Sequence, residues 1–321
     1  MSAMGPSEVA RLEPCDSVYV SPHADDVFLS CPARLIQEQA RGAKILIVTL
    51  FDEGGRSPQG ASAAGRASFL DRPGVQHLDV GMPAAPTRDH AYRTFRGLTE
   101  GRQAVDEGCL SQAVELLADV GHRTRAREVY LPLGVGQHID HRLAHEASRS
   151  AFPPRGGGRN VFLYEERPEA FVPGAVRVRL SQVGARLPPG AVAAADRAGL
   201  ARLLVRFHVA PTFRGDLKGW GDRLRSAGLA ARQWRESRAW HPLKGLGPRL
   251  QPVVDAAAEP APEVRELIGP RSAALEKLGR AYSVAVGGQA YAERYWLLLP
   301  AREADGLESL PAVVGEESRD A

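Results

Sequence analysis

Short apolar runs alternate with helix-like segments through the first half of the chain. The strand-like runs are residues 18–20, 44–51, 76–80, 129–133 and 160–164. The helix-like segments between or after them are residues 32–41, 109–120 and 142–151. Residues 18–51 hold a strand, a helix and a second strand, which is the pattern of a parallel βαβ unit. The order predicts an α/β fold with a mostly parallel sheet.

The pattern changes after residue 168. Residues 176–180 alternate like an exposed edge strand, and residues 191–207 and 222–240 are Arg-rich and helix-like. This stretch is interpreted as a helical or irregular insertion packed beside the sheet. The expected organisation is an α/β core, a cap or insertion, a return to the core that ends in a strand, and a flexible tail. These four parts correspond to residues 1–168, 169–270, 271–300 and 301–321.

Metal-capable side chains follow two of the strand-like runs. His23, Asp25 and Asp26 come after the first run, and a second set follows residues 129–133, namely His138, Asp140 and His141. The carboxyl ends of parallel strands meet at one edge of a sheet, where open α/β sheets bind ligands. Clustered carboxylates raise each other's pKa, and a divalent cation removes that cost. Three nitrogen and oxygen ligands with one open position for water match a catalytic zinc site, so the core is expected to bind metal.

The two motifs also carry a family resemblance. Pro-His-Ala-Asp-Asp at 22–26 and His-Ile-Asp-His at 138–141 resemble the PIG-L/LmbE-like zinc-dependent N-deacetylases. Further similarity to strands and closing segments of that family lies at residues 162–166 (Phe-Leu-Tyr-Glu-Glu), 277–282 and 288–296. The resemblance covers residues 16–168 well and roughly the last fifty residues loosely. It implies a Rossmann-like three-layer sandwich.

The resemblance also implies roles for the motif residues. His23, Asp26 and His141 are the expected zinc ligands, one Zn²⁺ per chain, although Fe²⁺ or Co²⁺ would suit the same donors. Asp25 is the expected general base, which takes a proton from water and passes it to the leaving amine. His138 is expected near the developing oxyanion, as imidazolium or as hydrogen-bond donor. Asp140 is expected to orient a neighbouring histidine.

Substrate contacts are expected around the same edge. Asp52, Glu53 and Arg56 follow the second strand, and carboxylates and arginine suit the hydroxyl groups of a sugar. Arg66 is the one remnant of a longer Arg/Glu-bearing helix of the family, which is trimmed in this chain. A polar, Arg-rich stretch at residues 82–103 is favoured as a solvated loop over a contact with an aglycone or phosphate. His145 is expected to be a solvated helix residue.

These features favour a hydrolase that removes an N-acetyl or N-acyl group from an amino sugar or related conjugate. The insertion and the trimmed helix suggest a specialised substrate, such as an antibiotic-type glycoside. Three alternatives remain: an amidase acting on a thiol conjugate, a metal-dependent phosphoesterase, and a sugar-binding protein without turnover. The phosphoesterase needs more ligands than the two motifs supply. The sugar-binding protein has no need of a base at Asp25.

Composition and charge restrict the classes of binding partner that are expected. A net charge of +3 with mixed signs argues against a nucleic-acid partner, and no apolar stretch is long enough for a membrane span. Three irregularly spaced cysteines do not form a disulfide framework, which favours a reduced, cytoplasmic protein. The expected partner is a small N-acylated molecule, and the oligomeric state is left open.

Overall fold

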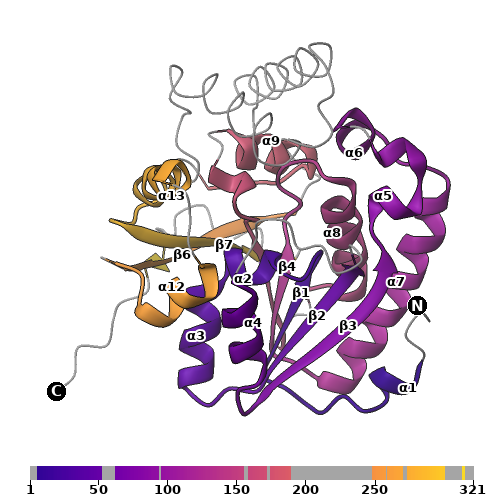
Figure 1. The fold of residues 1–321 in the computed structure, drawn as a ribbon, viewed down its shortest axis with the longest axis horizontal. Helices are drawn as coiled ribbons and strands as arrows, with labels where there is room; N and C mark the ends of the chain where they lie inside the picture. The colour runs from indigo at the N-terminus through magenta and orange to yellow at the C-terminus, as the bar shows by residue number, and fades with distance from the viewer. Residues whose placement is uncertain are drawn as a thin grey trace.

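The computed structural model describes residues 6–52, 62–93, 95–154, 158–171, 174–188, 248–257, 259–269, 273–300 and 313–314. Within these residues, eight strands form one sheet in the order β3-β2-β1-β4-β5-β7-β6-β8 (Figure 1). The strands are β1 (Ser17–Ser21), β2 (Ile45–Asp52), β3 (Val75–Pro83), β4 (Glu128–Pro132), β5 (Asn160–Tyr164), β6 (Leu250–Ala257), β7 (Tyr291–Leu298) and β8 (Val313–Val314). The strands β1 to β5 are parallel, and β7 is antiparallel to both β5 and β6. The predicted α/β fold with a mostly parallel sheet is confirmed.

Helices precede, connect and follow the strands. The α-helices are α1 (Pro6–Val9), α2 (Asp26–Ser30), α3 (Pro32–Ala40), α4 (Ala63–Leu70), α5 (Ala85–Arg88), α6 (Phe95–Glu100), α7 (Val105–Thr124), α8 (Ile139–Ala151), α9 (Ala175–Gln182), α12 (Pro262–Ile268) and α13 (Ala273–Ala285). Two short 3₁₀ helices are η1 (His90–Arg93) and η2 (Glu169–Phe171). Among the described residues, no helix combines the length and apolar composition needed to span a bilayer.

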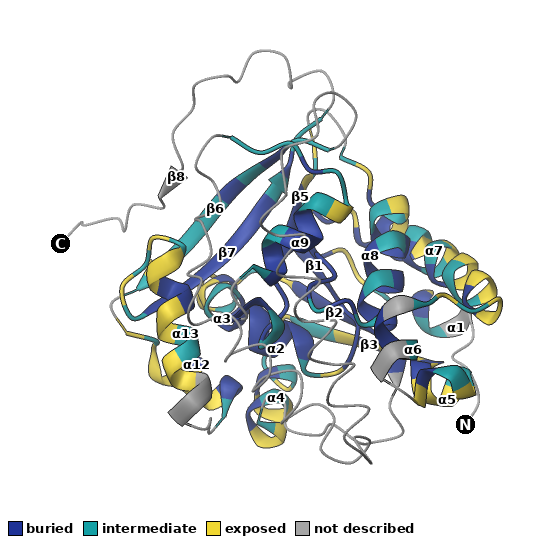
Figure 2. Cartoon of the chain, turned by 90° about the horizontal axis from the view of Figure 1, so that it is seen from above, coloured by how far each residue is buried: buried dark blue, intermediate teal, exposed yellow. Residues whose placement is uncertain are grey.

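Alternation along the strands separates the core into two layers. Val18 and Val20 of β1 point to the face covered by α7 and α8, whereas Tyr19 points to the face covered by α2, α3 and α4. In β2, Leu46 and Val48 share the first face, and the residues on either side of Leu46 share the second. Successive strand side chains point to opposite faces, so fully apolar strands require helices on both sides. Figure 2 shows the central strands buried and the outer surface of α7 exposed.

The segment after β5 differs from the sequence-based prediction in two places. Residues 175–182 form the helix α9, so the predicted edge strand at 176–180 is wrong. Val176 and Leu180 are four residues apart, which is about one helical turn. A stretch of five residues is therefore too short to distinguish the strand period of two from the helix period of 3.6. The predicted cap at 169–270 also extends too far, because β6 and α12 pack with the sheet and with α3 and α4. Residues 189–247 lie outside the described residues.

The C-terminal part completes the sheet. β7 pairs with β5, which joins residues 271–300 to the core, although the strand begins at Tyr291 rather than at the predicted residue 295. Val313 and Val314, within the predicted flexible tail, pair with β6 as β8. The rest of 301–321 lies outside the described residues.

Glu293 of β7 ties this C-terminal strand to α3. It is fully buried and accepts hydrogen bonds from the N–H groups of Ala33 at 2.7 Å and Arg34 at 3.2 Å. It also accepts hydrogen bonds from the hydroxyl groups of Tyr291 and Tyr295, both at 2.6 Å. The carboxylate therefore accepts hydrogen bonds from N–H groups that have no partner within α3. Its negative charge also interacts favourably with the positive end of the helix dipole.

We expect Glu293→Ala to lower the free energy of unfolding by roughly 3 kcal/mol or more, because four donors lose their acceptor, two of them buried tyrosine hydroxyl groups. Urea denaturation followed by circular dichroism measures this loss. Glu263→Ala is the matched control, since Glu263 is an exposed glutamate in the first turn of α12. Equal stability of the two variants would contradict the role assigned to Glu293.

Candidate metal centre

The first strand leads through a tight turn into α2. The backbone N–H of His23 donates to Oδ2 of Asp26 at 2.8 Å. Ser21 Oγ accepts the N–H of Val27 at 3.2 Å, which fixes the first turn of the helix. Asp25 occupies the N-cap position, and its side chain makes no capping hydrogen bond. The turn thus holds His23 Nδ1 3.2 Å from Asp26 Oδ2.

A glycine-rich loop leads from β4 into α8. Gly134 and Gly136 have positive φ angles of 84° and 85°. A Cβ on Gly136 would lie 2.4 Å from Cγ of Glu169, so only glycine permits this approach. His138 caps α8, because its Nδ1 accepts the N–H of Asp140 at 3.2 Å. The loop thereby places His138, Asp140 and His141 within one helical turn.

The two motifs converge at the carboxyl edge of the sheet, as predicted from their positions after parallel strands. One ligand atom from each of His23, Asp26 and His141 lies within 4.8 Å of the others. Nε2 of His141 is 3.4 Å from Oδ2 of Asp26. Two imidazole nitrogens and one carboxylate oxygen suit Zn²⁺, and also Fe²⁺ or Co²⁺. His23, His138 and Asp140 form a second such group that shares His23.

The electrostatics of the cluster favour positive charge. Burial lowers the pKa of His141, but the neighbouring Asp26 and Glu166 carboxylates raise it more, to about 9. Burial likewise opposes protonation of His23, and hydrogen bonds to Asp140 and Asp26 outweigh it, so the His23 pKa is raised. Burial raises the pKa of Asp26, but His141 and His23 bring it down to about 2. A divalent cation would use the same stabilisation of positive charge.

The pKa values of Asp25 and His138 are shifted in the directions that proton transfer and hydrogen-bond donation require. Burial and repulsion from Asp26 raise the pKa of the half-buried Asp25, against the opposing charges of His23 and Arg66. Burial lowers the pKa of His138 to about 3, despite the nearby Asp140 carboxylate. His138 is therefore neutral at pH 7. Since its Nδ1 accepts a backbone N–H, its proton resides on Nε2, which is a hydrogen-bond donor.

Asp140 joins the two motifs to a third segment. Its Oδ2 lies 3.1 Å from Nε2 of His23 and accepts the N–H of Ala85 at 2.9 Å. Its Oδ1 lies 2.8 Å from Nη2 of Arg88. Arg88 also donates from Nε to Oδ1 of Asp106 at 2.7 Å, and only 2% of its side chain is exposed. The Arg-rich stretch at 82–103 is therefore not a solvated loop around Arg88, and Tyr92 is fully buried as well.

Two carboxylates that the sequence interpretation left without a site role lie beside His141. Glu166 accepts the N–H groups of Gly134 at 2.6 Å and Val135 at 3.0 Å, and its Oε1 is 3.6 Å from Nδ1 of His141. Glu169 follows in η2, and burial raises its pKa to about 7. The sequence carried a signal for Glu166, because it follows β5 by two residues and the ends of parallel strands meet at one sheet edge, whereas Glu169 lies further on, in η2.

The expected substrate residues are only partly described. Arg66 lies in α4, and its charge is close enough to lower the pKa of Asp25. Its Nε is buried and has no hydrogen-bond partner within the part of the chain that the structure describes. Asp52 ends β2 at the same edge, while Glu53 and Arg56 lie outside the described residues. His145 is buried against Pro132 O, which lies 2.8 Å from its Nδ1, so the prediction of a solvated histidine is wrong.

We expect Arg88→Met to weaken Zn²⁺ binding by about tenfold to a hundredfold, because Asp140 loses the cation that holds it against His23. Zinc affinity from competition with a chelator measures the effect, with circular dichroism to confirm folding. Arg88→Lys should restore part of the affinity. Arg102→Met is the matched control, since Arg102 forms partly exposed ion pairs with Glu107 and Glu146. Equal zinc affinity in the Arg88 and Arg102 variants would exclude this role.

We expect His141→Ala to lose the bound metal, because only His23 and Asp26 of the first group remain. Metal content per chain, measured by plasma mass spectrometry after gel filtration, tests this. His145→Gln is the control: it also alters a buried histidine of α8, but one that lies outside both ligand groups. Unchanged metal content in His141→Ala would remove His141 from the ligand set.

Comparison with known proteins gives a relative in sequence. The chain is 30% identical over 206 residues to a 2'-N-acetylparomamine deacetylase of Streptomyces fradiae, and the match covers 61% of this chain and 72% of the relative. No family model matches the chain.

Comparison with solved structures gives more distant similarities. The zinc-inhibited form of a teicoplanin deacetylase is similar over 88% of this chain and 97% of its own, at 17% identity and a TM-score of 0.46. An N,N'-diacetylchitobiose deacetylase from Pyrococcus horikoshii is similar over 88% and 84%, at 13% identity and a TM-score of 0.36.

Proposed function

This chain belongs to the PIG-L/LmbE-like family of N-deacetylases, and we propose that it is a metal-dependent hydrolase that removes an N-acetyl group from an amino sugar. The observation that carries the proposal is the cluster of His23, Asp26 and His141 with Asp25 beside it. A ligand set with an adjacent carboxylate of raised pKa is what hydrolysis of an amide requires.

The proposed reaction is the attack of water on the carbonyl carbon of the N-acetyl group. His23, Asp26 and His141 would hold Zn²⁺, which when bound supplies a Lewis acid that makes water nucleophilic at neutral pH. Asp25 accepts the proton of the attacking water. The same carboxyl group then donates that proton to the nitrogen of the leaving amine. Burial and the nearby Asp26 raise the pKa of Asp25, which brings its basicity closer to neutral pH.

The neutral His138 is proposed to stabilise the oxyanion. Its Nε2–H is directed away from the backbone N–H that Nδ1 accepts, and 22% of its side chain is exposed. A donor at this position would bond the oxygen that gains charge as the amide carbon becomes tetrahedral. Asp140, held by Arg88 and the N–H of Ala85, keeps His23 in place. The hydrogen-bond-donor role of His138 is thus favoured over the imidazolium role.

The proposed substrate is an N-acetylated amino sugar of an antibiotic-type glycoside. The relative from Streptomyces fradiae is named as a deacetylase of 2'-N-acetylparomamine, an N-acetylated molecule. Arg66 lies near Asp25, where a guanidinium group would donate to a sugar hydroxyl. Asp52, Glu53 and Arg56 remain candidates for the other hydroxyl groups. Zinc is the proposed metal, one ion per chain.

We expect Asp25→Ala to retain the metal and to lose acetate release by roughly a hundredfold or more, because general base catalysis contributes this much. Acetate release from a panel of N-acetylated aminoglycosides and N-acetylglucosaminides measures turnover, with metal content measured on the same samples. Asp119→Ala is the matched control, since Asp119 is an exposed aspartate on α7.

Two results would count against the proposal in different ways. Full turnover by Asp25→Ala would remove Asp25 from the role of base. One metal per chain without acetate release from any member of the panel would exclude these amino sugars as substrates.

A further inference from the structure

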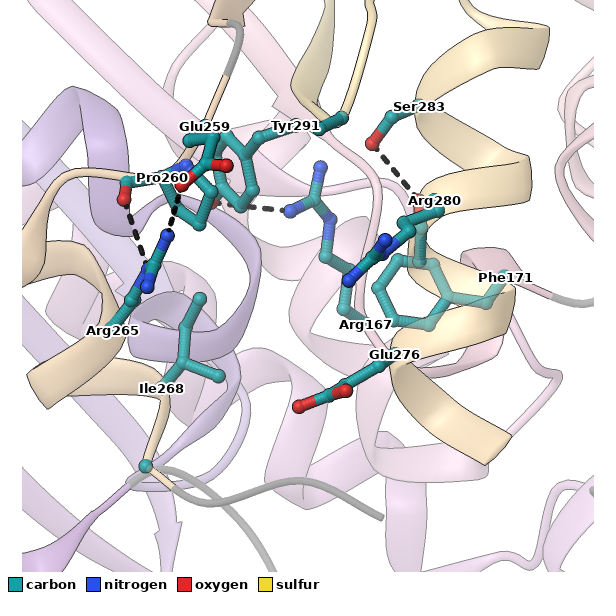
Figure 3. A pocket seen from close by; sticks show the side chains of 13 residues that line it. Arg167, Phe171, Glu259, Pro260, Arg265, Ile268, Glu276, Arg280, Ser283 and Tyr291 are labelled. Atoms are coloured by element: carbon teal, nitrogen blue, oxygen red, sulfur yellow. Dashed lines mark hydrogen bonds and ion pairs between the residues drawn. The ribbon is translucent and has the colours of Figure 1, made fainter. Parts of the chain in front are cut away.

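One cavity is lined by residues other than the candidate metal ligands. Its volume is about 340 Å³, within the range of roughly 300–1,000 Å³ that small-molecule sites occupy. It is bounded by the loop after β5, α12, α13 and the first residue of β7 (Figure 3). We propose that this cavity binds the carboxylate or phosphate group of a small ligand, at a site separate from the metal centre.

Arg167 supplies the buried positive charge of this cavity. Only 2% of the residue is exposed, and its guanidinium carbon lies 5.5 Å from the ring centroid of Phe171 and 5.4 Å from that of Tyr291. Nη1 donates to the hydroxyl of Tyr291 at 3.3 Å, and Nη2 donates to Ala292 O. Among the described residues Nε has no hydrogen-bond partner, and the atom itself has almost no exposed surface. Arg167 lines the cavity, so its positive charge acts on this space at short range and favours an anionic ligand there.

Arg280 supplies a second positive charge from α13. Figure 3 shows its side chain extending from the helix toward Arg167. It is exposed and forms no ion pair with any described residue. Arg265 lies at the opposite side of the cavity and is neutralised by Glu259 at 2.6 Å. Two guanidinium groups facing one space favour a ligand with planar anionic oxygens, which guanidinium binds in pairs of hydrogen bonds.

The remaining lining residues indicate the chemistry of the part of the ligand that is not anionic. Phe171, Ile268 and Tyr291 offer apolar and aromatic surface on which a ring can pack. Glu276, one helical turn before Arg280, is exposed at the rim and carries the opposing charge. A small cyclic molecule with a single anionic group matches this combination, whereas a cation would meet Arg167.

The cavity and the metal centre share a wall. Glu166 faces His141, and the next residue, Arg167, faces the cavity. The backbone N–H of Arg167 also donates to Oγ of Ser30 at 3.0 Å, in the helix that begins at Asp26. The anionic group therefore has two possible sources. The first is the acylated substrate, and this possibility rests on the proposed deacetylase function. The second is a separate small molecule.

Isothermal titration with inorganic phosphate tests the site without any turnover, so its failure is distinct from a failure of the proposed function. We expect Arg280→Ala to weaken phosphate binding by about tenfold. Lys277→Ala, which removes an exposed positive charge from α13 outside the cavity lining, should leave it unchanged. Glu276→Gln should strengthen it, because a repelling charge is removed. His141→Ala should retain phosphate binding although it loses the metal.

The opposite pattern overturns the proposal. Phosphate binding that is lost in His141→Ala and kept in Arg280→Ala would assign the anion to the metal centre. Absence of phosphate binding to the unmodified protein at millimolar concentration would also exclude the site.

Kinetics then distinguish the two sources. N-acetylglucosamine and N-acetylglucosamine 6-phosphate are compared in the unmodified protein and in Arg280→Ala. A KM that rises in the variant for the phosphorylated sugar alone, at constant kcat, assigns the anionic group to the substrate. Equal KM changes for both sugars, with phosphate binding still dependent on Arg280, assign the cavity to a separate molecule.

Discussion

The geometry of the candidate metal centre depends on the interactions of the buried carboxylate of Asp140. It lies against His23 from the β1–α2 turn, Arg88 and Ala85 N from α5, and the N-cap of its own helix. Three segments far apart in the chain therefore meet at one charged group. A buried carboxylate is stable only when its partners are all present, so the geometry of the ligands and the packing of α5 are coupled.

Much of the fold followed from local patterns. The runs at 44–51 and 160–164 are apolar on both strand faces, which occurs in sheets covered by helices on both sides. The positions of the two metal motifs directly after β1 and β4 were enough to predict that they meet, because parallel strands align their carboxyl ends. The family resemblance named on those residues agrees with the relative from Streptomyces fradiae.

What the sequence left open depends on tertiary contacts. Arg88 looks like a surface arginine because nothing within its own segment reveals the two buried carboxylates it meets, at positions 106 and 140. His145 looks solvated because a polar residue on a helix is usually exposed, yet the carbonyl of Pro132 supplies a partner inside the core. The pairing of β6 with β7 was missed because the stretch before it changes character at residue 168.

The pairing of β5 with β7 has a consequence for how the protein is made. Within the described residues, β5 gains its second neighbouring strand only when residues 291–298 are added. The hydrogen-bond donors of Glu165 also come late in the chain, from Tyr282, Arg294 and Trp296. During synthesis the nascent chain therefore carries an uncovered, apolar strand edge through more than a hundred residues of elongation. The loop that holds Glu166 beside His141 leaves this same strand. The sheet edge that carries the candidate site is thus among the last parts to be fixed, and the nascent protein is exposed to misassociation until β7 leaves the ribosome.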